Sequence, residues 1–233
     1  MLEIAEVIPY KSIRRIIGKR MEASNATPQS YQGLYVDVTD LMEVRREVNA
    51  TGEHPKLSFN DFVVAASVRA LQNTPLANSA IVDKEIQIYK NINIGVIAST
   101  ERGIIAPVLR DCQDKDIFQM SEEFKGLHKK AMDGTLMPDE YSEGTFSITN
   151  IGPLNADDSV PLLMPPQAAC LAVCTSQRKP VVRVIDGEEQ IVIRTMCKLV
   201  IDADHRILDG PPMAKILNDI KDALEDPRSL LPA

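Results

Sequence analysis

Residues 201–212 read IDADHRILDGPP, and they join the last strand that the sequence predicts to the last helix. The strand before them, residues 190–205, is rich in Ile and Val, and the helix after them begins at Pro211, a residue common in a first helical turn. His205 lies where this strand ends, with acidic and basic residues around it. Segments that connect rigid elements often carry functional side chains, so His205 is the first candidate for a functional residue.

The other two histidines have ordinary surroundings. His54 lies in a polar segment before Pro55, and His128 lies beside two lysines on the polar face of a predicted helix, residues 116–133. Both are expected to be solvated surface residues. For His205 the sequence also allows a purely structural interpretation, in which a histidine at a strand end pairs with a nearby carboxylate.

Along the rest of the chain, hydrophobic periodicity and capping residues predict an alternation of helices and strands. Ser12 is the expected cap of the first helix, and Asp186-Gly187 is a strong hairpin turn signal. Strands joined by helices alternate with hairpins, so the sequence predicts one α/β domain with a mixed sheet. The expected helices are residues 12–25, 41–49, 61–73, 116–133 and 211–226, and the main expected strands are residues 31–38, 80–82, 86–89, 92–99, 145–150, 167–176, 180–185 and 190–205.

Composition excludes several classes of protein. The chain has 233 residues, of which 44% are hydrophobic and 4% aromatic, so an aliphatic core is expected. A net charge of -7 with scattered Lys and Arg argues against binding of nucleic acid or membrane through a basic face. No apolar stretch approaches the roughly 20 residues of a membrane span, and no signal pattern opens the chain. A cytoplasmic location is expected, or the mitochondrial matrix in a eukaryote.

The four cysteines predict neither a disulfide nor a metal site. Cys170 and Cys174 lie on one predicted strand, where their backbones would be roughly 13 Å apart, too far for a disulfide. A zinc site would need tighter Cys pairs or nearby His, and the sequence has neither. Reduced, mostly buried thiols and no bound metal are therefore expected.

The segment HRILDG matches the His-x-x-x-Asp-Gly signature that chloramphenicol acetyltransferase shares with the dihydrolipoyl acyltransferases of 2-oxo acid dehydrogenase complexes. Asp204 to Gly210 has the longer form, Asp-His-Arg-x-x-Asp-Gly, typical of the second group. Other segments resemble the same family in order and spacing, so the resemblance covers about residues 9–231. These segments are GTFSITNIGP (144–153), MPPQAACLAV (164–173), NIGVIASTERGIIAPVLRD (93–111) and RRIIGKRMEASNATPQ (14–29).

This resemblance implies a chloramphenicol acetyltransferase-like two-layer sandwich, with a mixed β-sheet and helices packed on one face. Residues 1–233 would be a single acyltransferase catalytic domain, without a lipoyl or a peripheral subunit-binding domain. The implied activity moves an acyl group between the thiol of dihydrolipoyl-lysine and coenzyme A. Acetyl, succinyl and branched-chain acyl groups all remain open.

The resemblance also implies roles for two residues at the reacting atoms. A thiol is mostly protonated at neutral pH and only the thiolate is nucleophilic, so a base must remove the proton. An imidazole is suited to this task, and His205 is the implied general base. The attack creates an oxyanion that needs a positioned donor. The family uses a Ser hydroxyl there, and the matching residue is Thr149, which keeps the donor but adds a methyl group.

Further site residues follow by resemblance. Asp209 is carried over as a member of the catalytic group. It would brace the loop of His205 through an ion pair, for which Arg14 or Arg15 is the natural partner. Asn150 is expected to line the same pocket as Thr149. Gly210 is expected to allow a close backbone approach at the start of the last helix.

The implied partners are those of a multienzyme core. Coenzyme A is a substrate, and the lipoyl group arrives on a lipoyl domain outside this chain. The expected assembly is a homotrimer with active sites between subunits, with His205 from one and Thr149 from the other. An exposed apolar tail, SLLPA (229–233), is expected to join trimers into a core of 24 or 60 subunits. The decarboxylating dehydrogenase and dihydrolipoyl dehydrogenase would bind through other domains.

Two alternatives remain open on the sequence. One is an acyltransferase of the same fold that acts on a hydroxyl, and the other is a catalytically weak or inactive assembly scaffold. The second is favoured by Thr149 at the usual Ser position and by two departures from the glycine-rich family pattern. These are Glu143-Gly144, where the family usually has Gly-Gly, and residues 152–160, GPLNADDSV. They predict an unusual acyl preference or lipoyl docking.

Overall fold

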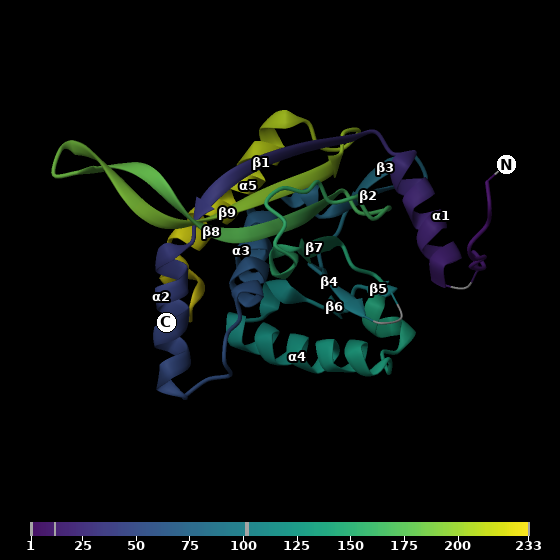
Figure 1. The fold of residues 1–233 in the computed structure, drawn as a ribbon, viewed down its shortest axis with the longest axis horizontal. Coiled ribbons are helices and arrows are strands. Elements are labelled where there is room, and N and C mark those ends of the chain that lie inside the picture. Colours follow the sequence, from purple (N-terminus) through teal and green to yellow (C-terminus); the bar gives the residue numbers. More distant parts are fainter. Residues whose placement is uncertain (1, 12, 101–102, 233) are drawn as a thin grey trace.

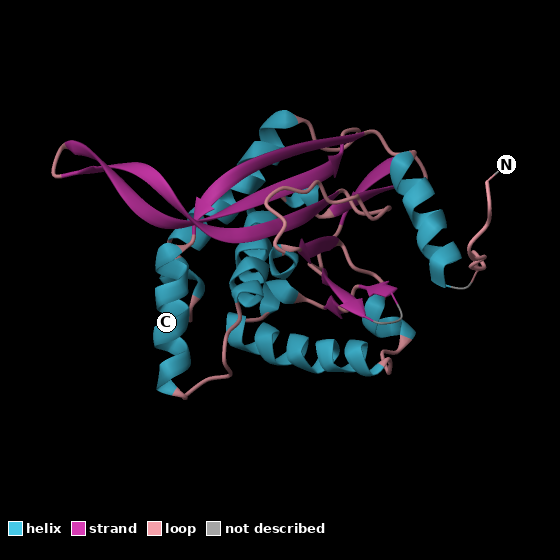
Figure 2. Ribbon diagram, viewed as in Figure 1, coloured by secondary structure: helices cyan, strands magenta, loops and turns pink. Residues whose placement is uncertain are grey.

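The computed structural model describes residues 2–11, 13–100 and 103–232, and it consists of a mixed sheet with helices packed against it (Figures 1 and 2). The helices are α1 (Ile13–Asn25), α2 (Thr39–Thr51), α3 (Phe59–Asn73), α4 (Ile117–Asp133) and α5 (Gly210–Glu225). The strands are β1 (Gln29–Asp37), β2 (Ser79–Val82), β3 (Glu85–Ile88), β4 (Ile94–Thr100), β5 (Gly103–Ile105), β6 (Val108–Leu109), β7 (Phe146–Asn150), β8 (Ala169–Ile185) and β9 (Glu188–Asp204).

Helix boundaries follow from their caps. Ser58 and Asp61 form a capping box at the start of α3, and Asp116 accepts hydrogen bonds from two backbone N–H groups in the first turn of α4. Gly134 ends α4 in the left-handed conformation that glycine tolerates best. The predicted helices are therefore confirmed to within a few residues. Ser12, the expected cap of α1, lies outside the described residues.

The main sheet has the strand order β1-β9-β8-β7-β4-β5, with β6 also paired to β4. Strand β7 is parallel to both β4 and β8, and the other pairs are antiparallel, so the predicted mixed sheet is confirmed. The irregular segment 151–168 makes the parallel connection from β7 to β8. It reaches as far as β1, where the Leu163 N–H donates a hydrogen bond to Gln29 Oε1.

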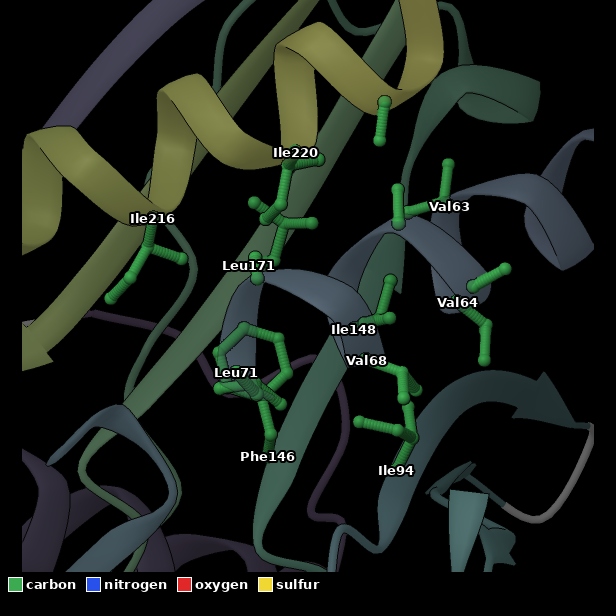
Figure 3. Packing of buried hydrophobic residues seen from close by; sticks show 14 of the residues in the cluster. Val63, Val64, Val68, Leu71, Ile94, Phe146, Ile148, Leu171, Ile216 and Ile220 are labelled. Carbon is green, nitrogen blue, oxygen red and sulfur yellow. The ribbon is translucent and has the colours of Figure 1, made fainter. Parts of the chain in front are cut away.

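Helices α3 and α5 pack on the same face of the sheet and form the core with it (Figure 3). Val68 and Leu71 of α3 and Ile220 of α5 meet Phe146 and Leu171 from the strands. All five are buried, and the core is almost entirely aliphatic, as the composition predicts. This packing confirms the two-layer arrangement and fixes β7 and β9, the strands that carry the candidate residues.

Strands β8 and β9 form a long hairpin whose far half extends beyond the sheet (Figure 1). Asp186 and Gly187 make its tip with φ values of 53° and 86°, which confirms the predicted turn. The prediction of two separate strands, 167–176 and 180–185, is wrong, because β8 continues through Pro180. In this two-stranded arm Pro180 has β9 on one side only, so its missing N–H breaks no sheet pairing on the outer side.

The prediction of an exposed apolar tail is also wrong. Leu230 is 9% exposed and packs in the core of its own chain, and Leu231 packs against that core. The guanidinium of Arg69 holds the turn by donating hydrogen bonds to the hydroxyl and the backbone oxygen of Ser229. Burial of Leu230, with Leu231 partly buried against the same core, reduces the exposed apolar surface that the tail prediction required.

Candidate functional site

His205 lies in the turn that follows β9, directly beside the start of β1. Its backbone N–H donates to the carbonyl of Pro28 at 2.8 Å, which ties the turn to the residue before β1. The imidazole is exposed, and no hydrogen bond or ion pair of its ring is found among the described residues. The ring is therefore available to a substrate or to another chain.

Asp204 and Arg206, the two neighbours of His205, hold the turn in shape. The carboxylate of Asp204 is 4% exposed and accepts hydrogen bonds from the Arg206 backbone N–H at 3.0 Å and from its guanidinium at 2.6 and 2.9 Å. The Asp204 carbonyl also accepts from the N–H groups of Ile207 and Leu208. Sequence reasoning missed this role, although the adjacent Asp-His-Arg order was a signal for it.

Asp209 is found at the N-cap position of α5, but its side chain makes no capping hydrogen bond. The ion pair expected with Arg14 or Arg15 is not formed within the described part of the chain. Both arginines lie at the start of α1, about 15 Å along the helix from Asn25, the end of α1 nearest to His205. Such a pair needs α1 to come from another copy or to move.

Gly210 does not have the backbone conformation that requires glycine. A side chain there would meet only the amide end of Gln32, at 3.4 Å, which is an ordinary contact. Within the described part of this chain no backbone atom approaches Gly210 closely, and the expected close approach stays a prediction. Instead the carbonyl of Gly210 accepts a hydrogen bond from the Gln32 side chain at 3.1 Å, which joins the start of α5 to β1.

Thr149 and Asn150 line one cavity of about 570 Å³ at the end of β7. Asn150 is held from both ends, because its amide donates to Asn60 and its oxygen accepts from the Gly152 N–H at 2.8 Å. His128, predicted to be a surface residue, is exposed but also lines this cavity. The structure thus brings Thr149 and Asn150 together, as expected for a shared pocket.

Thr149 and His205 do not meet within one chain. In the sheet register Thr149 lies opposite Ala172, and Ala172 lies opposite Val200, five residues before His205. Two strand spacings and five residue rises put the two backbones roughly 19 Å apart. Their side chains are too short to act on one carbonyl group from these positions.

A second cavity of about 350 Å³ lies between α1, β4 and β7. Ser147 and Gln167 line it, and each has one buried polar atom, Ser147 Oγ and Gln167 Oε1, without a hydrogen-bond partner among the described residues. Ile97 borders both this cavity and the one that contains Thr149. Sequence reasoning did not single out Ser147 or Gln167, since a strand Ser and a loop Gln carry no distinctive signal.

Glu143 shows how the chain accommodates its departure from the glycine pattern. Its φ is 59°, in the left-handed region that favours glycine. The Asn93 amide donates to the Glu143 carbonyl, and Arg110 pairs with the Glu143 carboxylate at 2.8 Å. These contacts hold the backbone shape that a glycine would adopt without strain.

The four cysteines are free and buried. Burial raises the pKa of Cys112 and of Cys197 to about 11, so neither supplies a thiolate at neutral pH. Among residues 2–11, 13–100 and 103–232, no cluster of three or more His, Cys, Asp or Glu is placed to hold a metal ion. Within the same residues, no helix has the length and apolar character that crossing a membrane requires.

Comparison with known proteins gives a consistent result. The family model described as 2-oxoacid dehydrogenases acyltransferase (catalytic domain) matches residues 3–232. The dihydrolipoyllysine-residue acetyltransferase component of the pyruvate dehydrogenase complex of Rickettsia bellii (strain RML369-C) is 34% identical over 227 residues, which are 96% of this chain and 53% of that protein. The chain spans about half the length of the curated relatives it matches first.

Solved structures agree with the family match. The probable dihydrolipoamide acetyltransferase of Listeria monocytogenes 4b F2365 has a TM-score of 0.88 at 31% identity, covering 95% of this chain and 94% of that one. The dihydrolipoamide acetyltransferase of Azotobacter vinelandii, investigated for the roles of a serine, a histidine and an asparagine in its catalytic mechanism, has a TM-score of 0.89 at 25% identity, covering 98% and 94%.

A chloramphenicol acetyltransferase has a TM-score of 0.52 at 15% identity, covering 94% of this chain and 99% of that one. At this level of identity the likeness concerns the fold alone. It confirms the predicted fold class.

Proposed function

Because this chain belongs to the family of 2-oxoacid dehydrogenases acyltransferase catalytic domains, we propose that it transfers an acyl group between a dihydrolipoyl thiol and the thiol of coenzyme A. The observation that carries this proposal is the match over residues 3–232, which includes the intact Asp-His-Arg turn, whose imidazole is exposed and has no partner among the described residues. We further propose acetyl as the acyl group, because the relatives are acetyltransferases.

In the proposed reaction His205 is the general base. Its imidazole takes the proton from the coenzyme A thiol, and the thiolate attacks the carbonyl carbon of the acyl-lipoyl thioester. The hydroxyl of Thr149 donates a hydrogen bond to the oxyanion of the tetrahedral intermediate. The bond to the lipoyl sulfur then breaks, and that sulfur takes the proton from the His205 imidazolium. No electrons are gained or lost overall.

The distance between Thr149 and His205 supports an active site formed by two copies of the chain. A base and an oxyanion donor must both reach one thioester group, which a separation of roughly 19 Å within one chain does not allow. We therefore infer a symmetric assembly in which His205 of one copy faces Thr149 of the next, in the trimer that the family resemblance implies.

Two further residues, Asp209 and Asn150, have proposed supporting roles. Asp209 is a positioning residue for the histidine turn, through Arg14 or Arg15 of another copy of α1. Asn150 keeps the end of β7 fixed beside Thr149, through its contacts with α3 and Gly152. Neither of these roles requires contact with the reacting atoms.

The proposed setting is a 2-oxo acid dehydrogenase complex, since the relatives are components of the pyruvate dehydrogenase complex. A lipoyl domain outside these residues would deliver the acyl group. The decarboxylating dehydrogenase and dihydrolipoyl dehydrogenase would complete the reaction cycle, and trimers would associate into a core of 24 or 60 subunits. The relatives come from bacteria and from mitochondria, and either setting fits this proposal.

A catalytically inactive scaffold is the second candidate function. Thr149 at the usual Ser position favours it, because the extra methyl group restricts the side chain that must hold the oxyanion.

The test is acyl transfer from acetyl-, succinyl- and isobutyryl-coenzyme A to free dihydrolipoamide. We expect turnover that is fastest with acetyl-coenzyme A and falls by about 10²- to 10⁴-fold in His205→Ala. His54→Ala is the matched control, because His54 is an exposed histidine that only stacks on Phe118. An assembled protein without turnover for any donor would reject the enzyme proposal in favour of the scaffold.

A further inference from the structure

The cavity between α1, β4 and β7 is apolar apart from a few polar groups. Ile16 and Ile17 of α1 form one wall, and Ile97, Ile105 and Val108 from the strand region form another. Its volume of about 350 Å³ is large enough for part of a small ligand. Two buried side chains of its lining, Ser147 and Gln167, each have one polar atom without a hydrogen-bond partner among the described residues, and they give this apolar cavity a point of chemical recognition.

Ser147 is the first of these side chains. It is 1% exposed, and its hydroxyl has no hydrogen-bond partner among the described residues. A buried hydroxyl without a partner costs free energy, so an unpaired one in a cavity wall indicates a missing ligand group. Gly95 lies directly opposite in the register, and a methyl group there would come within 3.3 Å of Ser147 Oγ. Because Gly95 has no side chain, no methyl group crowds the hydroxyl from that side.

Gln167 is the second. It is 9% exposed, and its amide nitrogen donates to the carbonyl of Gly144 at 2.9 Å. This bond fixes which end of the amide is the nitrogen, because a reversed amide would set two oxygens against each other. The remaining oxygen, Gln167 Oε1, is a buried acceptor without a partner in the described part of the chain. A matching ligand therefore supplies an N–H or O–H donor to Gln167 Oε1. The same ligand supplies an acceptor for the hydroxyl of Ser147.

The position of Ser147 relates this cavity to the proposed reaction. Ser147 and Thr149 are two residues apart on β7, so their side chains lie on the same face of the sheet, roughly 7 Å apart. Ile97 borders the cavities of both residues. A ligand whose thioester carbonyl is held at Thr149 can thus extend along the sheet face to Ser147.

We propose that Ser147 and Gln167 bind the secondary amide closest to the sulfur in the pantetheine arm of coenzyme A. This inference rests on the proposed function. Only two carbon atoms separate the sulfur from that amide. This spacing suits the distance between the side chains of Thr149 and Ser147. The amide N–H donates to Gln167 Oε1, and the amide carbonyl accepts from the Ser147 hydroxyl. Dihydrolipoamide also has an amide, but four methylene groups lie between its carbonyl and the nearest thiol-bearing carbon, which is too long for this step.

The test compares the KM for coenzyme A with the KM for dihydrolipoamide in Ser147→Ala and Gln167→Met. We expect the KM for coenzyme A to rise about 3- to 10-fold in each variant, as the loss of one hydrogen bond predicts, and the KM for dihydrolipoamide to stay unchanged. Ser121→Ala is the matched control, because Ser121 also has a buried hydroxyl without a partner but lies on α4, outside both cavities.

Small thioesters test the amide itself. Wild type should prefer S-acetyl-N-acetylcysteamine, which keeps this amide, over S-butyl thioacetate, which lacks it, and Ser147→Ala should lose most of that preference. An unchanged preference, or a higher KM for dihydrolipoamide alone, would overturn the assignment.

Calorimetric binding of desulfo-coenzyme A separates this inference from the proposed function. If wild type transfers no acyl group, the proposed function fails by itself. A Kd for desulfo-coenzyme A that still rises in Ser147→Ala and not in Ser121→Ala would then support the amide site, and equal Kd values in all three proteins would reject it.

Discussion

Thr149 on β7 and His205 after β9 belong to the same sheet, yet two strand spacings and five register positions separate them, which is roughly 19 Å. The rigid sheet fixes this separation, because both strands are paired along their length and packed on the buried faces of α3 and α5. If both residues act on one thioester, they must come from different copies of the chain.

Mixed assemblies of two inactive variants test this arrangement. Thr149→Ala and His205→Ala, each nearly inactive alone, should regain activity when they are coexpressed and purified as one assembly. When the two variants pair at random, about one in four of the subunit interfaces has both an intact Thr149 and an intact His205. About one quarter of the wild-type rate is therefore expected. The measurement is the rate of acetyl transfer per total chain in the mixed assembly. A mixture as inactive as its components would show that one chain supplies both residues.

Substitutions at Thr149 separate its hydroxyl from its methyl group. Thr149→Ser keeps the donor and should change kcat by no more than about 3-fold, whereas Thr149→Val keeps the shape, removes the donor and should lower kcat by about 10²- to 10³-fold. Steady-state kinetics with acetyl-coenzyme A give both values. Equal rates for the Ser and Val variants would exclude Thr149 as the oxyanion donor.

Asp204 should matter for the rate more than for substrate binding. Asp204→Ala removes the acceptor that holds both the backbone and the guanidinium of Arg206, so His205 loses its fixed position. We expect kcat to fall about 10- to 100-fold with KM within about 2-fold, since misplacement of a catalytic group affects the chemical step. Asp204→Asn should recover part of the rate, because its amide oxygen still accepts from the Arg206 N–H. If kcat falls only in proportion to the fraction of folded protein, measured by circular dichroism, Asp204 would have a structural role instead.

Asp202 should make stability depend on pH. Burial raises the pKa of this carboxyl group to about 6, and the side chain is 1% exposed with one oxygen unpaired among the described residues. Well below pH 3.8, the ordinary pKa of this group, it is protonated in the folded and unfolded states and has no effect. As pH rises from 4 to 6 only the unfolded state ionises, which favours unfolding, and above pH 6 the penalty stays constant at no more than about 3 kcal/mol.

Asp202→Asn should therefore be more stable than wild type above pH 6 and about equal to it near pH 4. Urea unfolding from pH 4 to 7.5 measures the difference in the free energy of unfolding. Asp139→Asn, at an exposed carboxylate, should show no such trend. A difference for Asp202→Asn that is constant with pH would contradict burial of an ionisable group as the cause.

Local features of the sequence predicted the elements well because each depends on a few neighbouring residues. The helix predicted over residues 116–133 begins after its cap, Asp116, and the predicted Asp186-Gly187 turn forms the tip of the hairpin. Pro180 misled the strand prediction, because whether a missing N–H matters depends on a neighbouring strand that no local pattern reveals. The tail failed as a prediction for the same kind of reason, since burial of Leu230 depends on distant residues of the core.

By itself, the sequence determined the α/β elements, the aliphatic core, the family and the two residues with candidate chemistry, because propensity, capping and motif spacing are properties of short segments. Tertiary structure alone decided that Thr149 and His205 lie too far apart to act together in one chain, that Asp204 holds the histidine turn, and that Ser147 and Gln167 share a cavity. Strand order, register and the packing of the helices against the sheet set these relationships. They depend on contacts between residues far apart in the chain, which no local pattern encodes.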